Sequence, residues 1–196
     1  VLQFEIPRDG DYEVEIKDSI YRGREDFVYR IALGELPFVT SIFPLGGRVG
    51  EITPVELQGW NLPTNQFAVK AASAGIARTV VGTNALPGTL LPFAGDSLPE
   101  TTEIEPNNTA ATAQRIDLPI IINGRITAPG DVEVFQIEGR AGEEIVAEVL
   151  ARRLNSPLDS ILTVFDGAGQ PLGRNDDFED RASGLNTHHA DSYLRV

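Results

Sequence analysis

Two short acidic stretches carry the residue types that bind hard divalent cations. The first, 103–108, reads EIEPNN and the second, 131–133, reads DVE. Calcium takes about six to eight oxygen ligands, largely from carboxylates and carbonyls. Alternate side chains of an extended segment point the same way, so each stretch would present its oxygen atoms on one face. The candidate ligands are Glu103, Glu105, Asn107, Asp131 and Glu133.

Pro106 lies between two of these candidates. Proline lacks a backbone donor and restricts φ, which suits a fixed ligand loop better than a strand interior. A solvated acidic linker in an acidic protein has the same spacing. The residues by themselves therefore leave both a calcium site and a linker open.

A second acidic group lies further along the chain. Asp and Asn are favoured in turns because their side chains bond to nearby backbone, which accounts for part of the run NDDFED at 175–180 without a metal. Strand ends converge in a sandwich, however, so a second cation site is an alternative. Its candidate ligands are Asp159, Asp176, Asp177 and Asp191.

The segment THHADS at 187–192 raises the question of catalysis. A catalytic triad needs a base held by an orienting carboxylate, yet adjacent residues of a strand point to opposite faces. His189 could share one face with Asp191, and His188 could share the other face with Ala190 or Ser192. The chain has two histidines, whereas catalytic zinc takes about three protein ligands. We expect a structural loop and no enzyme activity.

Composition restricts the class of protein. The net charge of -13 opposes binding to nucleic acid, whose phosphates require basic patches. Cysteine is absent, which excludes disulfide frameworks and zinc–thiolate sites. No apolar run is long enough to cross a bilayer. Gly 19 and Pro 13, spread along the chain, favour many short strands over long helices.

The chain from about 99 to 196, within an expected domain at 97–196, resembles the bacterial pre-peptidase C-terminal (PPC) domain. The resemblance rests on EIEPNNTAATA at 103–113, GDVEVF at 130–135, SPLD at 156–159, and FDG at 165–167 followed by NDD at 175–177. It implies a jelly-roll-like β-sandwich attached to secreted enzymes or surface proteins, with calcium bound in some members. By this resemblance, the calcium ligands would be Glu103, Glu105, Asn107 and Asp131. Glu133 departs from the family, where aspartate is usual.

Residues 1–36 resemble the closing strands of the same domain. Tyr12, Val14 and Ile16 alternate with charged residues, the period of a half-buried strand, and 27–31 repeat the pattern. Residues 1–36 could complete the 97–196 sandwich within one chain or between neighbouring chains, or could belong to a longer array. An unpaired half-sandwich exposes strand edges, so we expect completion, in a monomer or in a strand-exchanged oligomer.

The segment 37–96 resembles, more weakly, the immunoglobulin-like IPT/TIG domain. The resemblance rests on PFVTSIFP at 37–44 with Gly46-Gly47, and on TPVELQGWNL at 53–62. Strands are expected at 67–71 and 77–81. We expect Trp60, the one tryptophan, to pack in or near the core, although an exposed binding aromatic is the alternative.

Together these features predict an all-β chain with a small immunoglobulin-like sandwich and a PPC-type sandwich. We expect a non-catalytic, calcium-binding accessory module of a secreted or cell-surface bacterial protein, in which calcium fixes how neighbouring domains are oriented. Adhesion to an extracellular protein or polysaccharide is a further expectation. The alternatives are a self-assembly module and a fragment of an extracellular hydrolase that lacks its catalytic domain.

Overall fold

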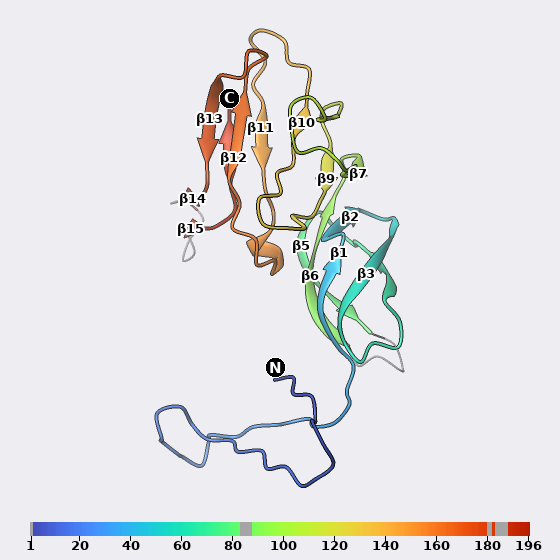
Figure 1. Cartoon of the computed structure of the whole chain (residues 1–196), viewed down its shortest axis with the longest axis vertical. Coiled ribbons are helices and arrows are strands. Elements are labelled where there is room, and N and C mark those ends of the chain that lie inside the picture. The colour runs from blue at the N-terminus through green and yellow to red at the C-terminus, as the bar shows by residue number, and fades with distance from the viewer. Residues whose placement is uncertain (1, 83–87, 180–181, 183–187) are drawn as a thin grey trace. The chain divides into compact units, whose positions relative to one another are not determined.

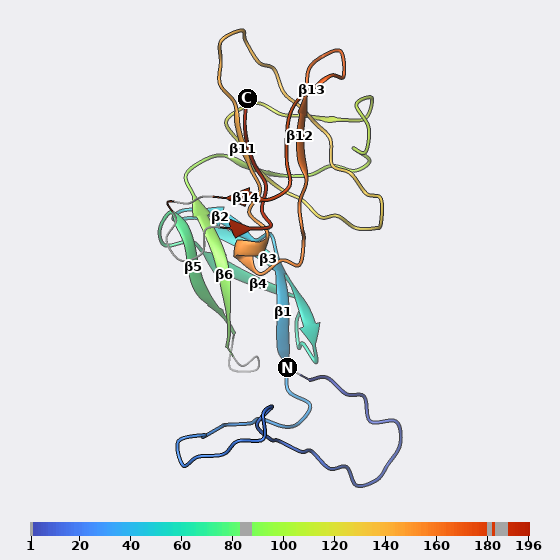
Figure 2. The same cartoon turned by 90° about the vertical axis from the view of Figure 1, so that its left-hand side faces the viewer.

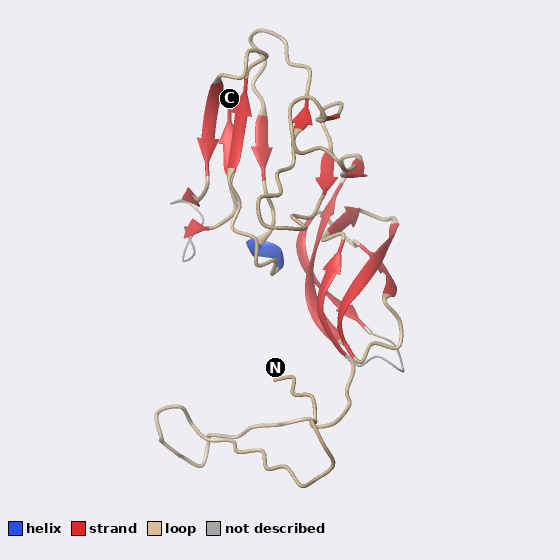
Figure 3. Cartoon of the chain, viewed as in Figure 1, coloured by secondary structure: helices blue, strands red, loops and turns tan. Residues whose placement is uncertain are grey.

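The structure, a computed structural model, describes residues 2–82, 88–179, 182 and 188–196. The chain falls into two compact units, Val1–Gly34 and Glu35–Val196 (Figure 1). In the described residues nearly all regular structure is β-strand, which confirms the all-β fold class (Figure 3). The one helical element in this part of the chain is the single 3-10 turn η1 (Arg152–Leu154), so no described helix could cross a membrane.

The first six strands form a small sandwich. Strands β1 (Phe38–Phe43), β3 (Ile52–Trp60) and β4 (Gln66–Lys70) make one antiparallel sheet. The other contains β2 (Gly46–Arg48), β6 (Thr89–Asp96) and β5 (Gly75–Val81), with β2 parallel to β6 and β5 antiparallel to it. The two sheets share one core, which consists of Val39, Ile42, Val55, Leu57, Val69, Ala71, Val81, Leu91 and Phe93.

Sequence alternation explains these strands. Val55 and Leu57 are buried, whereas Glu56 and Gln58 between and beyond them are exposed. That is the period of a strand with one face on the core. The strands predicted near 53–62, 67–71 and 77–81 are therefore confirmed, with shifted ends.

The close approach of the two sheets depends on a glycine. A Cβ atom at Gly47 would overlap the Thr53 hydroxyl oxygen. Trp60 is half-buried and stacks on Phe38, with ring centroids 5.7 Å apart, and neither ring is among the side chains that form the core or pack against it.

Strands in the remainder of the second unit are short and pair in twos. Two of the pairs are parallel and bring distant segments side by side: β7 with β9, and β8 with β10. The other three are antiparallel: β11 with β16, β12 with β13, and β14 with β15. The bounds are β7 (Glu100–Thr102), β8 (Gln114–Arg115), β9 (Ile121–Asn123), β10 (Phe135–Gln136), β11 (Val146–Glu148), β12 (Leu162–Phe165), β13 (Pro171–Asn175), β14 (Phe178–Glu179), β15 (His188–His189) and β16 (Tyr193–Arg195).

The apolar core of residues 97–196 is small. Among the described residues, its fully buried hydrophobic side chains are Ala151 and Leu154, while several large apolar side chains are exposed. Phe165 and Leu172, on the β12–β13 hairpin, are 58% and 59% exposed. Part of this sheet surface therefore lacks an apolar cover within the second unit.

The first unit corrects one expectation. Strands were predicted at 12–16 and 27–31, but the described residues 2–34 contain turns and bends and no strand. The alternation is real, yet its apolar residues stay open to solvent, with Val14 60% and Tyr29 72% exposed. The physical reason is that a strand pattern without a partner strand forms no ladder, and an isolated hairpin is marginal in water.

Candidate metal centre

The pairing of short strands brings the two acidic stretches together. Asn107 accepts a hydrogen bond through its backbone carbonyl from the N–H of Val134, at 3.0 Å. Gln114 donates its N–H to the Val134 carbonyl at the same distance, at the start of the β8–β10 pair. The end of the first stretch is thereby fixed beside the second stretch, although about 25 residues of chain separate them in the sequence.

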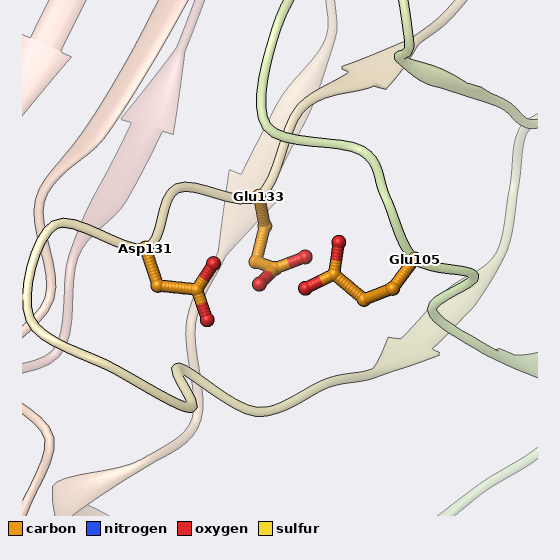
Figure 4. A group of neighbouring side chains, drawn as sticks. All are labelled: Glu105, Asp131 and Glu133. Atoms are coloured by element: carbon orange, nitrogen blue, oxygen red, sulfur yellow. The ribbon is translucent and has the colours of Figure 1, made fainter.

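Three carboxylates converge where these segments meet. Glu105, Asp131 and Glu133 each offer an oxygen atom that lies within 4.8 Å of the other two. Figure 4 shows the three side chains pointing toward a common space from two separate stretches of chain. Like charges at this distance repel, so a cation bound between them would lower the electrostatic energy of the group.

The other two predicted ligands contact members of this group: the Glu103 side chain contacts Glu133, and the backbone N–H of Asn107 donates to Glu105 Oε2. Asn107 is fully buried, and neither its amide oxygen nor its amide nitrogen has a hydrogen-bond partner. Both carboxylate oxygens of Glu133, and Oε2 of Glu103, are also buried without a partner. A buried polar atom left unsatisfied costs about 1–3 kcal/mol, so these atoms make the group a candidate binding site.

The electrostatics of Glu103 reflect this crowding. Its pKa is raised to about 7 from an ordinary 4.5. Burial is the largest cause, the contact with Glu133 and the charges of Glu133 and Glu105 add to it, and the hydrogen bond from the N–H of Arg125 opposes it. The carboxyl of Asp131 behaves differently. The N–H and hydroxyl of Thr127 donate to its Oδ2 at 2.6 and 2.9 Å, and they lower its pKa.

Several supporting residues have no signal in the sequence. Glu103 Oε1 accepts a hydrogen bond from the backbone N–H of Arg125 at 2.6 Å, and a Cβ atom at Gly124 would overlap Glu103 Oε2. Glu105 Oε2 accepts from the N–H of Asn107 at 2.9 Å. Main-chain donors and close approaches to glycine do not appear in residue spacing. Only Thr127, a hydroxyl residue four positions before Asp131, could have been suspected as a turn partner.

The residues present fit a hard cation. The group consists of three carboxylates, with the Glu103 carboxylate beside Glu133, and it lacks the thiolate and imidazole ligands that zinc favours. Calcium accepts carboxylates in one- or two-oxygen modes with flexible geometry, which suits side chains of mixed length. Magnesium requires a stricter octahedron and retains several waters. The donor set therefore favours calcium.

The second acidic group forms no comparable cluster. Asp159, Asp176, Asp177 and Asp191 are all described, and the structure does not gather three of them as it gathers the first group. Asp191 is fully buried and accepts from the N–H groups of Ala151, Arg152 and Arg153 and from the Arg153 guanidinium. Both of its oxygen atoms are thus occupied in holding η1. The second cation site stays a prediction with no grouping of carboxylates in its favour.

The segment around the two histidines shows no catalytic geometry in its described part. Ser192 is fully buried, and its hydroxyl lies 2.6 Å from the Ser160 carbonyl and 2.8 Å from the Ser160 hydroxyl. Asp191 faces Arg153 and η1, as above. His188 and His189 form β15, their side chains are not described, and Thr187 lies outside the described residues. The buried serine has the environment of a structural residue.

Comparison with known proteins gives limited information. The chain matches no protein-family model, and no solved structure matches it. It is 38% identical over 81 residues to a protein of Deinococcus radiodurans named as a probable subtilase-type serine protease. That similarity spans 37% of this chain and 10% of the relative. The chain is therefore similar to a small part of a protease-like protein.

Proposed function

We propose that this chain is a non-catalytic, calcium-binding accessory part of a secreted or cell-surface bacterial protein. The cation ties the segment 103–107 to the loop 127–133. Because these stretches come from different strand pairs, one ion holds together elements that are otherwise linked by a few hydrogen bonds. Binding free energy then adds to folding free energy.

The single observation that carries this proposal is the set of orphaned oxygen atoms. Asn107 is buried with an unpaired amide, and both carboxylate oxygens of the half-buried Glu133 are shielded from solvent without a hydrogen-bond partner. A solvated acidic linker would leave its side chains in water, where each oxygen is hydrated. Buried carboxylates without partners are stable only with a proton or a metal ion.

The context of the module is part of the proposal. The similarity to PPC domains implies an attachment to an extracellular enzyme, and the protease-like relative supports that context. The partners we propose are neighbouring domains of the parent protein and an extracellular protein or polysaccharide. The small core of residues 97–196 gives calcium a clear stabilising role, since cysteine is absent.

Thermal unfolding tests the calcium proposal. We expect the melting temperature of the full chain to rise by several degrees between EDTA and millimolar calcium, and the rise to vanish in Glu105→Ala. A free calcium concentration of about 100 times Kd would stabilise the folded state by about 2.7 kcal/mol. An equal melting temperature in both buffers would exclude a calcium site.

A second candidate function is assembly by strand exchange. The observation that favours it is the exposed apolar surface in both units: Val14 and Tyr29 in the first, and Phe165 and Leu172 in the second. A segment with alternating residues and an open sheet can pair by β-augmentation. In this second candidate, residues 1–34 of one copy cover the open sheet of another.

Sedimentation velocity separates this candidate from a monomeric module. Strand exchange predicts oligomers that dissociate on dilution and that Val14→Asp abolishes, with Asp11→Asn as a control at an exposed position nearby. A single monomeric species at every concentration would exclude it.

A further inference from the structure

Arg125 connects the candidate metal centre to the first sandwich. Its backbone N–H donates to Glu103 Oε1 at 2.6 Å. Its side chain extends to another part of the unit, where the guanidinium donates to Glu56 Oε2 at 2.5 Å. The guanidinium carbon also lies 3.9 Å from the centroid of the Phe43 ring. One residue therefore contacts a candidate ligand through its main chain and the β1–β3 sheet through its side chain.

The two residues under the guanidinium are themselves neighbours. Phe43 and Glu56 are directly opposite one another in the antiparallel β1–β3 register. Arg125 thus covers a cross-strand pair with a ring face for its charge and a carboxylate for its N–H groups. The ion pair is partly exposed, with side-chain exposures of 38% and 47%, so by itself it stabilises weakly. Such a contact is strengthened or weakened by small changes in the position of Arg125.

Glu103 is the residue through which the cation would act on this contact. Its Oε2 faces the cluster without a partner, while its Oε1 holds the Arg125 peptide. A cation bound by Glu103 would fix the carboxylate, and the fixed carboxylate would fix the peptide that positions the guanidinium. The backbone of Glu103 is held in place beside the β7–β9 pair, because its N–H donates to the Asn123 carbonyl at 3.0 Å.

We propose that cation binding at the Glu103 cluster and the contact of Arg125 with Phe43 and Glu56 are energetically coupled. Bound calcium then strengthens the contact between the β1–β6 sandwich and the metal-binding segment, and the contact strengthens calcium binding by the same factor, as linkage requires. This inference rests on the proposed calcium function. Arg125 acts as a positioning residue and does not touch the ion.

The direction in which one substitution changes the calcium affinity distinguishes coupling from simple electrostatics. Arg125→Ala removes a positive charge, so charge alone would increase the affinity for a cation. Coupling predicts the opposite, a loss of calcium affinity of about fivefold or more. Arg115→Ala is the matched control. It removes the same charge, but Arg115 pairs with Glu138 and not with a residue of the first sandwich. Glu56→Gln, at an exposed position of β3, tests the contact from its other side.

The experiment combines calorimetric titration with calcium chloride and hydrogen exchange on the full chain. We expect calcium to slow amide exchange around Phe43 and Glu56 in the unaltered protein, and this protection to be lost in Arg125→Ala and Glu56→Gln. Both variants should bind calcium more weakly, whereas Arg115→Ala should not. Calcium binding that is unchanged in both variants, with no response in β1 and β3, would overturn the coupling and leave the calcium site intact. No calcium binding by the unaltered chain would overturn both proposals.

Discussion

Replacing Glu133 by glutamine should have opposite effects on stability with and without calcium. Without a cation, Glu133 is repelled by Glu105 and Asp131, whose carboxylate oxygens lie within 4.8 Å. A pair of unit charges at this distance repels by about 0.9 kcal/mol in a water-like dielectric and about 3.5 kcal/mol at an effective dielectric of 20. The site is partly open, so we expect a net gain near the lower end, about 1–3 kcal/mol.

This gain is measurable as a melting temperature in EDTA at pH 8. For a protein of this size about 1 kcal/mol corresponds to about 2–4 °C, so Glu133→Gln should melt about 2–12 °C above the unaltered chain. In millimolar calcium the order should reverse, because the variant lacks a ligand. Asp117→Asn, an exposed position outside the cluster, is the control and should change little in either buffer. A destabilised Glu133→Gln variant in EDTA, or the same order in both buffers, would refute the reasoning.

Three further outcomes follow from the structure. Gly124→Ala should displace the Glu103 carboxylate and weaken calcium binding in a titration, while the melting temperature in EDTA changes little, because the overlapped atom is the end of a flexible side chain. The pKa of Glu103 is raised to about 7 from an ordinary 4.5. Between pH 4.5 and 7 the folded state therefore keeps a proton that the unfolded state has lost. Stability in EDTA should therefore fall as pH rises from about 4.5 to 7, whereas calcium affinity should rise over the same range. Burial alone would raise the pKa of Asp191, but the hydrogen bonds from Arg153 and three N–H groups lower it overall, so its stabilisation is present above pH 3.8 and is lost as pH falls through the depressed value. Asp191→Ala should cost about 1–3 kcal/mol in chemical denaturation at pH 7, since it leaves three N–H donors at η1 without their acceptor, while Arg153 keeps its contact with Glu148.

Strand patterns were readable from the sequence where a partner strand exists. Val55 and Leu57 alternate with exposed residues, and their strand forms because β1 and β4 flank it. Tyr12, Val14 and Ile16 carry an equally clear alternation, yet the described residues around them form no strand. Alternation reports which face can be buried, and pairing depends on a surface that sequence patterns do not locate.

The candidate site shows the same division. Carboxylates and an amide two residues apart signalled a cation site, and the chain does bring Glu105, Asp131 and Glu133 together. The contributions of Gly124 and Arg125 were invisible, because one acts by having no side chain and the other through its backbone N–H.

Asp191 shows how much the spacing of acidic residues leaves open. It was grouped with a second cation site by its place at a strand end. In the structure its carboxylate accepts hydrogen bonds from three backbone N–H groups of a turn about 40 residues earlier in the chain. The geometry of a turn cannot be inferred from the spacing of acidic residues, so a buried structural carboxylate and a metal ligand look alike in the sequence.

Direct titration of the full chain with calcium tests the central claim. The account predicts one calcium ion per chain, with binding abolished by Glu105→Gln and retained by Asp176→Asn. Absence of a binding heat, together with absence of a shift in melting temperature, would contradict it. Binding that survives Glu105→Gln but is lost in Asp176→Asn would also contradict it, because the ion would then lie at the second acidic group.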